Sequence, residues 1–251
     1  MSPPNLPDTV AQVRARIAAS ARAAGRSPDA VTLLAVTKGQ PIEVLRAAVA
    51  AGLTHFGESY LQEALPKIAA LSTPQDLDLT WHFIGRVQAN KTRPVAQSFA
   101  WVHSVDRLKI AARLSEQRPY HAPPLNVCLE VNLAAETAKG GVCPADLPDL
   151  AARVAQLPRL TLRGLMCVPP QDEPESARRW FRELAALQAQ LRRTLPGLDT
   201  LSMGMSADFE EAVLEGATLV RIGTLLLGPR PAPAQGPRTP RKPPGRTPGE
   251  A

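Results

Sequence analysis

A lysine lies two residues after an apolar run near the start of the sequence. The run Leu33–Val36 is followed by Thr37, Lys38 and Gly39, and a helical pattern begins at once. Lysine is mostly exposed in proteins, so a charged cap at a strand end is one interpretation. In the other, burial lowers the pKa of the amine, which can then attack a carbonyl group as a free base. Lys38 is therefore the first candidate for chemistry.

Two segments near the other end of the sequence could hold an anion. The letters SMGMSADFEEA and VRIGTLLLG each describe a strand, a turn and a helix start. Ser206 is expected at the N-cap of the first helix, and Gly223 with Thr224 lets backbone approach a ligand closely. Free N–H groups at a helix start favour phosphate. Taken alone, Ser206 is more simply interpreted as a plain N-cap. When the two segments are considered together, a phosphate site and a plain N-cap are equally good interpretations.

A lysine on one side and a phosphate site on the other suggest a phosphorylated aldehyde held as a Schiff base on Lys38. Pyridoxal 5′-phosphate fits that description. This hypothesis requires that residues far apart in the sequence meet at one place, so it depends on the elements that carry them.

Short β-like runs alternate with helical patterns along the chain. We expect eight such units, the count that closes a (β/α)₈ barrel, preceded by an extra helix from Asp8 or Thr9 to Gly25. An open doubly wound sheet is the alternative, although no GxGxxG or Walker A pattern is present. Barrel active sites lie where the strands end. The residues expected there are Lys38, Glu58, Ser59, Gly85, Asn132, Met166, Ser206, Arg221, Gly223 and Thr224.

Composition limits the classes of protein that the chain can belong to. Hydrophobic residues make up 44% of the 251 residues, which is enough for a large core, while aromatic residues make up only 4%. The odd number of cysteines, Cys128, Cys143 and Cys167, has no metal-site spacing and predicts reduced thiols in a cytoplasmic protein. We expect no secretory leader, no membrane span and no metal.

The net charge of +6 is concentrated at the C-terminal end. Residues 229–251 contain five basic residues, one acidic residue and many prolines and glycines, without a large apolar side chain. Such a segment cannot bury enough surface to offset its ordering entropy. The sequence therefore predicts a barrel domain over residues 1–228 and a disordered Pro/Arg-rich tail over 229–251. A weak association of the tail with RNA is an alternative, but nucleic acid is not the expected partner.

Several stretches together resemble the pyridoxal phosphate homeostasis proteins, single-domain barrels related to the N-terminal domain of alanine racemase. They include LLAVTKGQP, FGESYLQEA, WHFIGRVQANK, LRGLMCVPP and LSMGMSADFEEAVLEGATLVRIGTLLLG, which lie between Leu33 and Gly228. The resemblance implies a barrel in which Lys38 carries the cofactor. It also implies that Ser206, Gly223 and Thr224 hold the phosphate and that Arg221 faces the pyridine nitrogen. Met166 and Ser59, at strand ends on the same face, complete the expected cofactor site.

The sequence departs from the family pattern at a few positions, and other residues are weaker candidates. Ser59 replaces the usual Asn, Arg86 the usual His or Pro, and Leu227 the usual Phe. His82 is expected to be a hydrogen-bonded histidine inside the barrel, and Cys167 a buried thiol. Lys91 and Lys139 could attract a second anion, although solvated lysines are the simpler expectation.

Arg221 argues for a binding protein rather than an enzyme. Carbanion chemistry on this cofactor usually relies on a carboxylate that keeps the ring nitrogen protonated, whereas arginine is a permanent donor. Alanine racemases add a tyrosine from a C-terminal domain of the partner subunit, and this chain ends shortly after the eighth unit. We therefore expect a monomeric, non-catalytic protein that holds pyridoxal phosphate and passes it to apo-forms of other enzymes. A weak racemase or lyase is the alternative.

Overall fold

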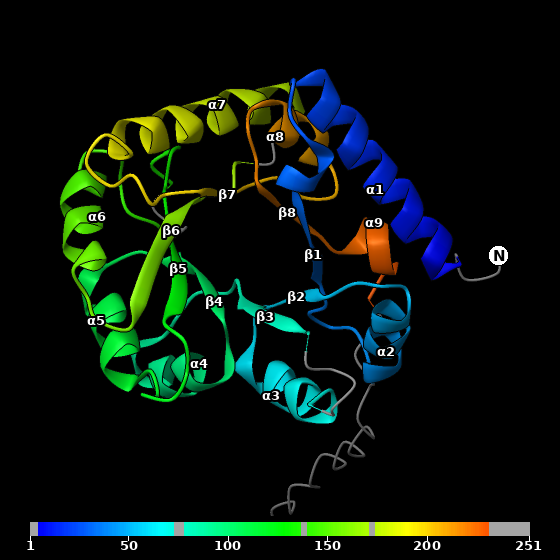
Figure 1. Ribbon diagram of the computed structural model, residues 1–251, viewed down its shortest axis with the longest axis horizontal. Helices are drawn as coiled ribbons and strands as arrows, with labels where there is room; N and C mark the ends of the chain where they lie inside the picture. Colours follow the sequence, from blue (N-terminus) through cyan, green and yellow to red (C-terminus); the bar gives the residue numbers. More distant parts are fainter. Residues whose placement is uncertain (1–4, 73–77, 137–139, 171–173, 231–251) are drawn as a thin grey trace, which may run out of the picture.

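The strands of the protein close into a parallel barrel, which Figure 1 views along its axis. The computed structural model describes residues 5–72, 78–136, 140–170 and 174–230. Each strand is hydrogen-bonded to the next along the chain, and β1 pairs with β8. The strands are β1 (Thr32–Val36), β2 (His55–Glu58), β3 (Thr80–Phe83), β4 (Trp101–Val105), β5 (Leu125–Glu130), β6 (Leu160–Met166), β7 (Thr200–Ser202) and β8 (Leu219–Ile222). The predicted barrel is confirmed, and the open sheet is wrong because the pairing of β1 with β8 closes it.

Helices form the outer ring in Figure 1. They are α1 (Leu6–Ala23), α2 (Ile42–Ala50), α3 (Leu61–Ala70), α4 (Thr92–Ser98), α5 (Leu108–Gln117), α6 (Leu147–Ala155), α7 (Pro174–Leu191), α8 (Phe209–Leu214) and α9 (Thr224–Leu227), with short 3₁₀ turns at Pro28–Ala30 and Ala89–Lys91. This arrangement buries the strands on both faces, which explains their nearly continuous apolar sequence.

The predicted extra helix, α1, packs outside the ring against α8 and α9. It begins at Leu6, earlier than expected, because Asn5 rather than Asp8 or Thr9 occupies the N-cap position. Its buried residues recur at the spacing of one helical face and are Val10, Val13, Ile17 and Ala21. This apolar stripe is what attaches the helix to the barrel.

The register between the first and last strands brings the two ends of the folded chain together. Leu34 lies opposite Arg221, and Ala35 lies opposite Ile222. Because these strands are parallel, Lys38 and Gly223 leave them at the same end of the barrel. The two sequence segments singled out for chemistry are thus neighbours in space.

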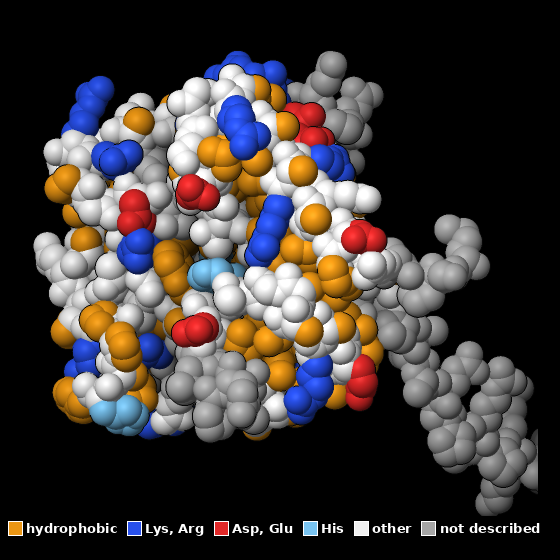
Figure 2. All heavy atoms as spheres, turned by 45° about the vertical axis from the view of Figure 1, so that its right-hand side comes forward, with side chains coloured by type: hydrophobic (Ala, Val, Ile, Leu, Met, Phe, Trp, Pro, Cys, Tyr) orange, Lys and Arg blue, Asp and Glu red, His pale blue; other side chains and the backbone are white. Residues whose placement is uncertain are grey.

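Charged side chains are spread over the surface. On the face that Figure 2 shows, lysine and arginine alternate with acidic and apolar side chains rather than forming one patch. Within the described ranges, every helix is too short or too polar to cross a membrane. Of the predicted tail, only Pro229 and Arg230 lie within the described residues, so its disorder stays a prediction.

Candidate cofactor site

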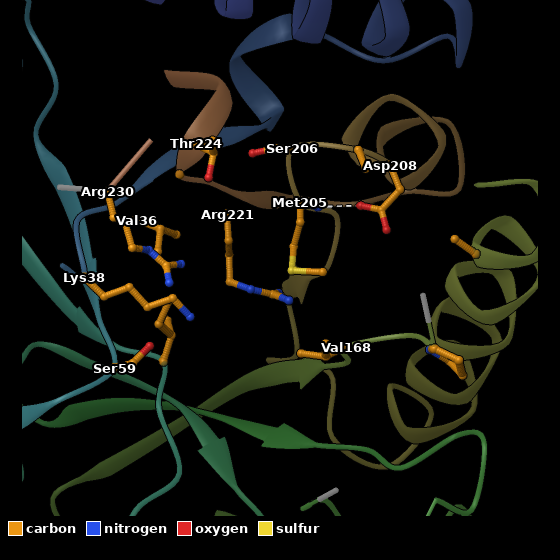
Figure 3. A pocket seen from close by; sticks show the side chains of 15 residues that line it. Val36, Lys38, Ser59, Val168, Met205, Ser206, Asp208, Arg221, Thr224 and Arg230 are labelled. Carbon is orange, nitrogen blue, oxygen red and sulfur yellow. Dashed lines mark hydrogen bonds between the residues drawn. The ribbon is translucent and has the colours of Figure 1, made fainter. Parts of the chain in front are cut away.

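A cavity of about 620 Å³ opens where the strands end (Figure 3). Six of the predicted site residues line it, and they come from the segments that follow β1, β2, β7 and β8 and from β8 itself. They are Lys38, Ser59, Ser206, Arg221, Gly223 and Thr224. The seventh, Met166, is the last residue of β6; it is buried, and it is not part of the wall of this cavity.

Lys38 reaches into the cavity from the end of β1 and faces Arg221 in Figure 3. Its side chain is half-buried. Burial lowers the pKa of its amine, and the positive charges of Arg230 and Arg221 lower it further, while Glu58 and Glu63 act in the opposite direction. Lys38 therefore becomes a neutral nucleophile at a lower pH than an ordinary surface lysine.

A buried ion pair braces the strand end that carries Lys38. The Nζ atom of Lys67, on α3, lies 2.7 Å from Oε1 of Glu58 and donates to the carbonyl oxygen of Thr37 at 2.8 Å. The hydroxyl of Thr37 donates to the same carboxylate oxygen at 2.7 Å. Because Thr37 precedes Lys38 directly, these contacts connect β1, β2 and α3 and fix the backbone from which the reactive lysine extends.

In Figure 3, the side chains of Ser206 and Thr224 face each other on one side of the cavity, and Lys38 lies on the other side. The predicted N-cap role of Ser206 is wrong, because residues 206–208 form a turn and α8 starts only at Phe209, with Asp208 at the N-cap position. The carboxylate of Asp208 accepts from the N–H of Met205 at 2.6 Å. Ser206 is left beside α9, where its Oγ lies 3.4 Å from the N–H of Leu225.

Gly223 lets the backbone before α9 lie close to β1. A Cβ atom at this position would come within 3.3 Å of the carbonyl oxygen of Val36. In the short helix α9, the N–H groups of Leu226 and Leu227 donate to the carbonyl oxygen of Gly223. Among the described residues, no partner is recorded for the N–H of Thr224, the first residue of the helix. The hydroxyls of Ser206 and Thr224 and the backbone at the start of α9 therefore meet at one side of the cavity.

Arg221 lies at the centre of the site and is 5% exposed. Its Nη1 donates to the carbonyl oxygen of Ser202 at 2.6 Å and to its hydroxyl at 2.9 Å, and Nη2 donates to the carbonyl oxygen of Cys167 at 3.0 Å. These contacts hold the guanidinium from behind. Among the described residues, no hydrogen-bond partner of Nε is recorded.

The structure also shows where the weaker candidates lie. His82 is buried and hydrogen-bonded to two other histidines, as expected. Cys167 is buried and its pKa is raised to about 12 by burial, so it is a neutral thiol. Lys91 and Arg86 are exposed and line a second cavity, of about 700 Å³, that shares Lys38 and Ser59 with the first. Lys139 lies outside the described residues.

Sequence reasoning missed Arg230 as a site residue. It was assigned to the tail, yet its side chain lines the cavity and lies over Gly39, where an added Cβ would come within 2.8 Å of its Cδ. Met205 and Val168 were missed as well. The composition after Pro229 contained no signal that would have separated Arg230 from the arginines that follow.

Comparison with known proteins identifies the class of protein that this fold and site define. The sequence matches the family "Alanine racemase, N-terminal domain" over residues 10–231. The alanine racemase of Corynebacterium glutamicum has the same fold, with a TM-score of 0.63 at 17% identity, and the match covers 88% of this chain and 61% of that one. The molecule is therefore a barrel of the alanine racemase N-terminal-domain type.

More similar proteins narrow the assignment. The pyridoxal phosphate homeostasis protein of Pseudomonas aeruginosa is 58% identical over 224 residues, which cover 89% of this chain and 95% of that protein. The structure of PipY from Synechococcus elongatus with pyridoxal phosphate bound is similar at 37% identity and a TM-score of 0.77; it covers 89% of this chain and 100% of PipY. The chain belongs to the pyridoxal phosphate homeostasis protein family, as its sequence motifs indicated.

Proposed function

We propose that this protein holds pyridoxal 5′-phosphate as a Schiff base on Lys38 and serves cofactor homeostasis in the cytoplasm without catalysing a reaction of its own. The observation that carries the proposal is the pairing of a half-buried amine of lowered pKa with Ser206 and Thr224 on the opposite side of one cavity. Membership of the family and the bound cofactor in the PipY structure support the same ligand.

The residues around the cavity fit this cofactor. An aldehyde needs a neutral amine, which Lys38 provides through its lowered pKa. A phosphate group needs several donors, and the hydroxyls of Ser206 and Thr224 meet there with the start of α9. Arg221, between the two, has an Nε–H group with which to meet a ring acceptor. A volume of about 620 Å³ is in the range of small-molecule sites.

Each residue has a distinct part in this proposal. Lys38 forms the covalent link, and Ser206, Gly223 and Thr224 bind the phosphate. Arg221 donates to the pyridine nitrogen and, as a permanent cation, keeps that nitrogen unprotonated. When bound, the cofactor supplies an aldehyde carbon for the link and a ring that can withdraw electrons.

The non-catalytic part of the proposal rests on the groups around Lys38. Asp208 is the carboxylic acid in the cavity wall, and it is engaged by the N–H of Met205. The two tyrosines, Tyr60 and Tyr120, are 60% and 89% exposed, and neither lines this cavity. Among the described residues that line the cavity there is thus no tyrosine opposite Lys38 of the kind that alanine racemases use. In this proposal, the role of the bound aldehyde is to be transferred to the apo-forms of other enzymes.

Borohydride reduction tests the linkage. Protein loaded with pyridoxal phosphate should be labelled at Lys38, and peptide mapping by mass spectrometry should find the label there. The variant Lys38→Arg should lose it, while Lys91→Arg, which changes an exposed lysine of the adjoining cavity, should keep it. A label that maps to Lys67, Lys91 or Lys109 would contradict the assignment.

Hydrogen exchange tests the absence of catalysis. Loaded protein incubated with alanine or serine in deuterated water should leave the α-hydrogen in place, because among the described residues no tyrosine lines the cavity opposite Lys38 and Asp208 is engaged by the N–H of Met205. The same preparation should restore activity to a cofactor-free pyridoxal enzyme. Rapid exchange with racemised product would instead establish the racemase alternative. The RNA alternative rests on residues 231–251, which lie outside the described residues.

A further inference from the structure

Polar side chains run across the inside of the barrel to the back of Arg221. Nδ1 of His55 lies 2.9 Å from Nε2 of His82, and Nδ1 of His82 lies 2.9 Å from Nε2 of His103. Nδ1 of His103 lies 2.7 Å from the hydroxyl of Ser202, which accepts from Arg221. We call His55, His82, His103 and Ser202 the histidine chain. It connects β2, β3, β4 and β7 to β8.

This arrangement is unusual for a barrel interior, which branched apolar side chains normally fill. His82, His103 and Ser202 are all fully buried, so each polar atom needs a partner. Burial lowers the pKa of His82 well below its ordinary value and that of His103 to about 3. Both imidazoles are therefore neutral near pH 7, and each has one donor and one acceptor nitrogen.

Arg221 determines the direction in which the hydrogen bonds run. A guanidinium can only donate, so the oxygen of Ser202 accepts from Nη1 and its proton is free to point to Nδ1 of His103. Nε2 of His103 then donates to His82, and Nε2 of His82 donates to His55. If the hydrogen bonds ran in the opposite direction, the oxygen of Ser202 would accept from both Arg221 and His103. The proton of Ser202 would then lack an acceptor, since no other one is recorded among the described residues. Only the first direction therefore gives the proton of Ser202 a recorded acceptor among the described residues, Nδ1 of His103.

The histidine chain does not conduct protons into the cavity, because arginine at its end keeps its protons at any ordinary pH. Its effect is on the orientation of that arginine. Nη1 is committed to Ser202 and Nη2 to Cys167, so the guanidinium plane is held, and among the described residues no partner is recorded for Nε–H. An oxygen whose own proton is engaged by His103 is a better-placed acceptor than a freely rotating hydroxyl.

We infer that Ser202 and His103, backed by His82, are positioning residues that hold Arg221 as a fixed donor towards the ring nitrogen of a ligand in the cavity. The inference rests on the proposed function for the identity of that ligand. It adds that the protonation state of the ring is set by groups on the far side of Arg221 that never touch the ligand.

Two kinds of measurement test this inference, and the first needs no cofactor. In the cofactor-free protein, NMR should show slow solvent exchange of the Nη1 hydrogens of Arg221, which are bonded to Ser202. The variant Ser202→Ala should speed this exchange by about tenfold, through loss of one hydrogen bond to a charged group. Ser115→Ala, at a buried hydroxyl that donates to Pro158 on the outside of the barrel, should leave it unchanged. An unchanged rate in Ser202→Ala would overturn the inference.

The second measurement is the absorption of the bound cofactor as a function of pH. The wild type should keep one visible band from mildly acidic to mildly alkaline pH. Ser202→Ala and His103→Leu should show a band that changes with pH, because a mobile arginine no longer keeps the ring nitrogen unprotonated. His103→Asn, whose amide can replace Nδ1 as an acceptor, should restore the wild-type response.

The outcomes separate this inference from the proposed function. Borohydride labelling of Lys38 should be nearly complete in every variant, because the histidine chain does not touch that residue. If wild-type protein itself cannot be labelled, the proposed function fails, while the exchange measurement still decides the role of Ser202. If labelling is intact and Ser202→Ala titrates like the wild type, the positioning role is refuted. Should His103→Leu fail to fold, Ser202→Ala and His103→Asn carry the comparison.

Discussion

At the residue scale, Lys38 differs from the other lysines of the chain in what surrounds it. Its half-buried amine shares the cavity with two arginines from the C-terminal end of the described chain, Arg221 on β8 and Arg230 after α9. Both positive charges lower the pKa of Lys38. The pH at which the amine becomes reactive therefore depends on segments from both ends of the barrel sequence: the one after β1 and those that carry the arginines.

Replacing Arg230 should therefore make Lys38 less reactive. In Arg230→Gln the pKa of Lys38 should rise, because one of the charges that lower it is gone. Labelling by pyridoxal with borohydride should be slower at neutral pH, and the pH–rate profile should move to higher pH. Pyridoxal has no phosphate, so a lost phosphate contact cannot explain the change. Arg153→Gln, at an exposed site on α6, is the control; equal profiles for both variants would contradict the argument.

Ser206 gives a second prediction at this scale. Its hydroxyl should contribute one hydrogen bond to a charged phosphate, so Ser206→Ala should weaken binding of pyridoxal phosphate by about 1–2 kcal/mol. Isothermal titration with pyridoxal should show little change between variant and wild type, because that vitamer lacks the phosphate. A similar loss for both vitamers would mean that Ser206 does not contact the phosphate.

At the scale of elements, the junction of β1, β2 and α3 depends on charges that water scarcely reaches. Glu58 is fully buried and Lys67 is 8% exposed. Burial raises the pKa of Glu58, whereas the hydrogen bonds from Lys67 and Thr37 lower it. Oε2 of Glu58 has no hydrogen-bond partner among the described residues, so Lys67 is the main compensation for this carboxylate.

Removing Lys67 should destabilise the protein strongly. Lys67→Met leaves an uncompensated buried carboxylate, and the free energy of unfolding should fall by about 3–5 kcal/mol. Urea unfolding followed by circular dichroism measures the change. The double variant Glu58→Gln/Lys67→Met should recover part of the loss, since no charge is then buried. Lys109→Met, at an exposed position on α5, should cost little; a comparable cost there would show that burial of the pair is not the cause.

At the scale of the whole molecule, the closed barrel encloses histidines that cannot be protonated without opening it. His82 and His103 lie on neighbouring strands, and both are fully buried. In the unfolded chain a histidine takes up a proton below about pH 6.5. In the folded protein the pKa of His103 is lowered to about 3 and that of His82 is also far below its ordinary value, with burial as the main cause.

Acid should therefore destabilise the fold. The unfolded state binds more protons than the folded state as the pH falls from about 6.5 towards about 3, so each buried histidine removes up to about 1.4 kcal/mol per pH unit in that window. Urea midpoints at several pH values measure the slope. His103→Asn should reduce it by up to one proton, whereas His121→Asn, at an exposed residue, should not. Equal slopes in the two variants would contradict burial of a neutral His103.

Local sequence patterns were sufficient to predict the strands, the helices and the end of the barrel at which chemistry could occur. Apolar runs punctuated by helical patterns predict eight strand–helix units, the number that closes a (β/α)₈ barrel, and strands that are apolar throughout are typical of a parallel sheet buried on both faces. Lys38 and the Gly223–Thr224 pair directly follow the first and last strands, so local pattern was enough to place them on one face. The same patterns carried the resemblance to the family, which the comparisons confirmed.

Which side chains meet could be learned only from the folded molecule. Ser206 was expected at a helix start, yet a local turn moved that start to Phe209 and left the hydroxyl beside α9. Arg230 reached the cavity by packing over Gly39, a contact that tail composition cannot reveal. The histidine chain joins side chains that four strands bring together only when the sheet curves and closes. Periodicity is a property of neighbouring residues, whereas these contacts depend on register, twist and closure over the whole barrel.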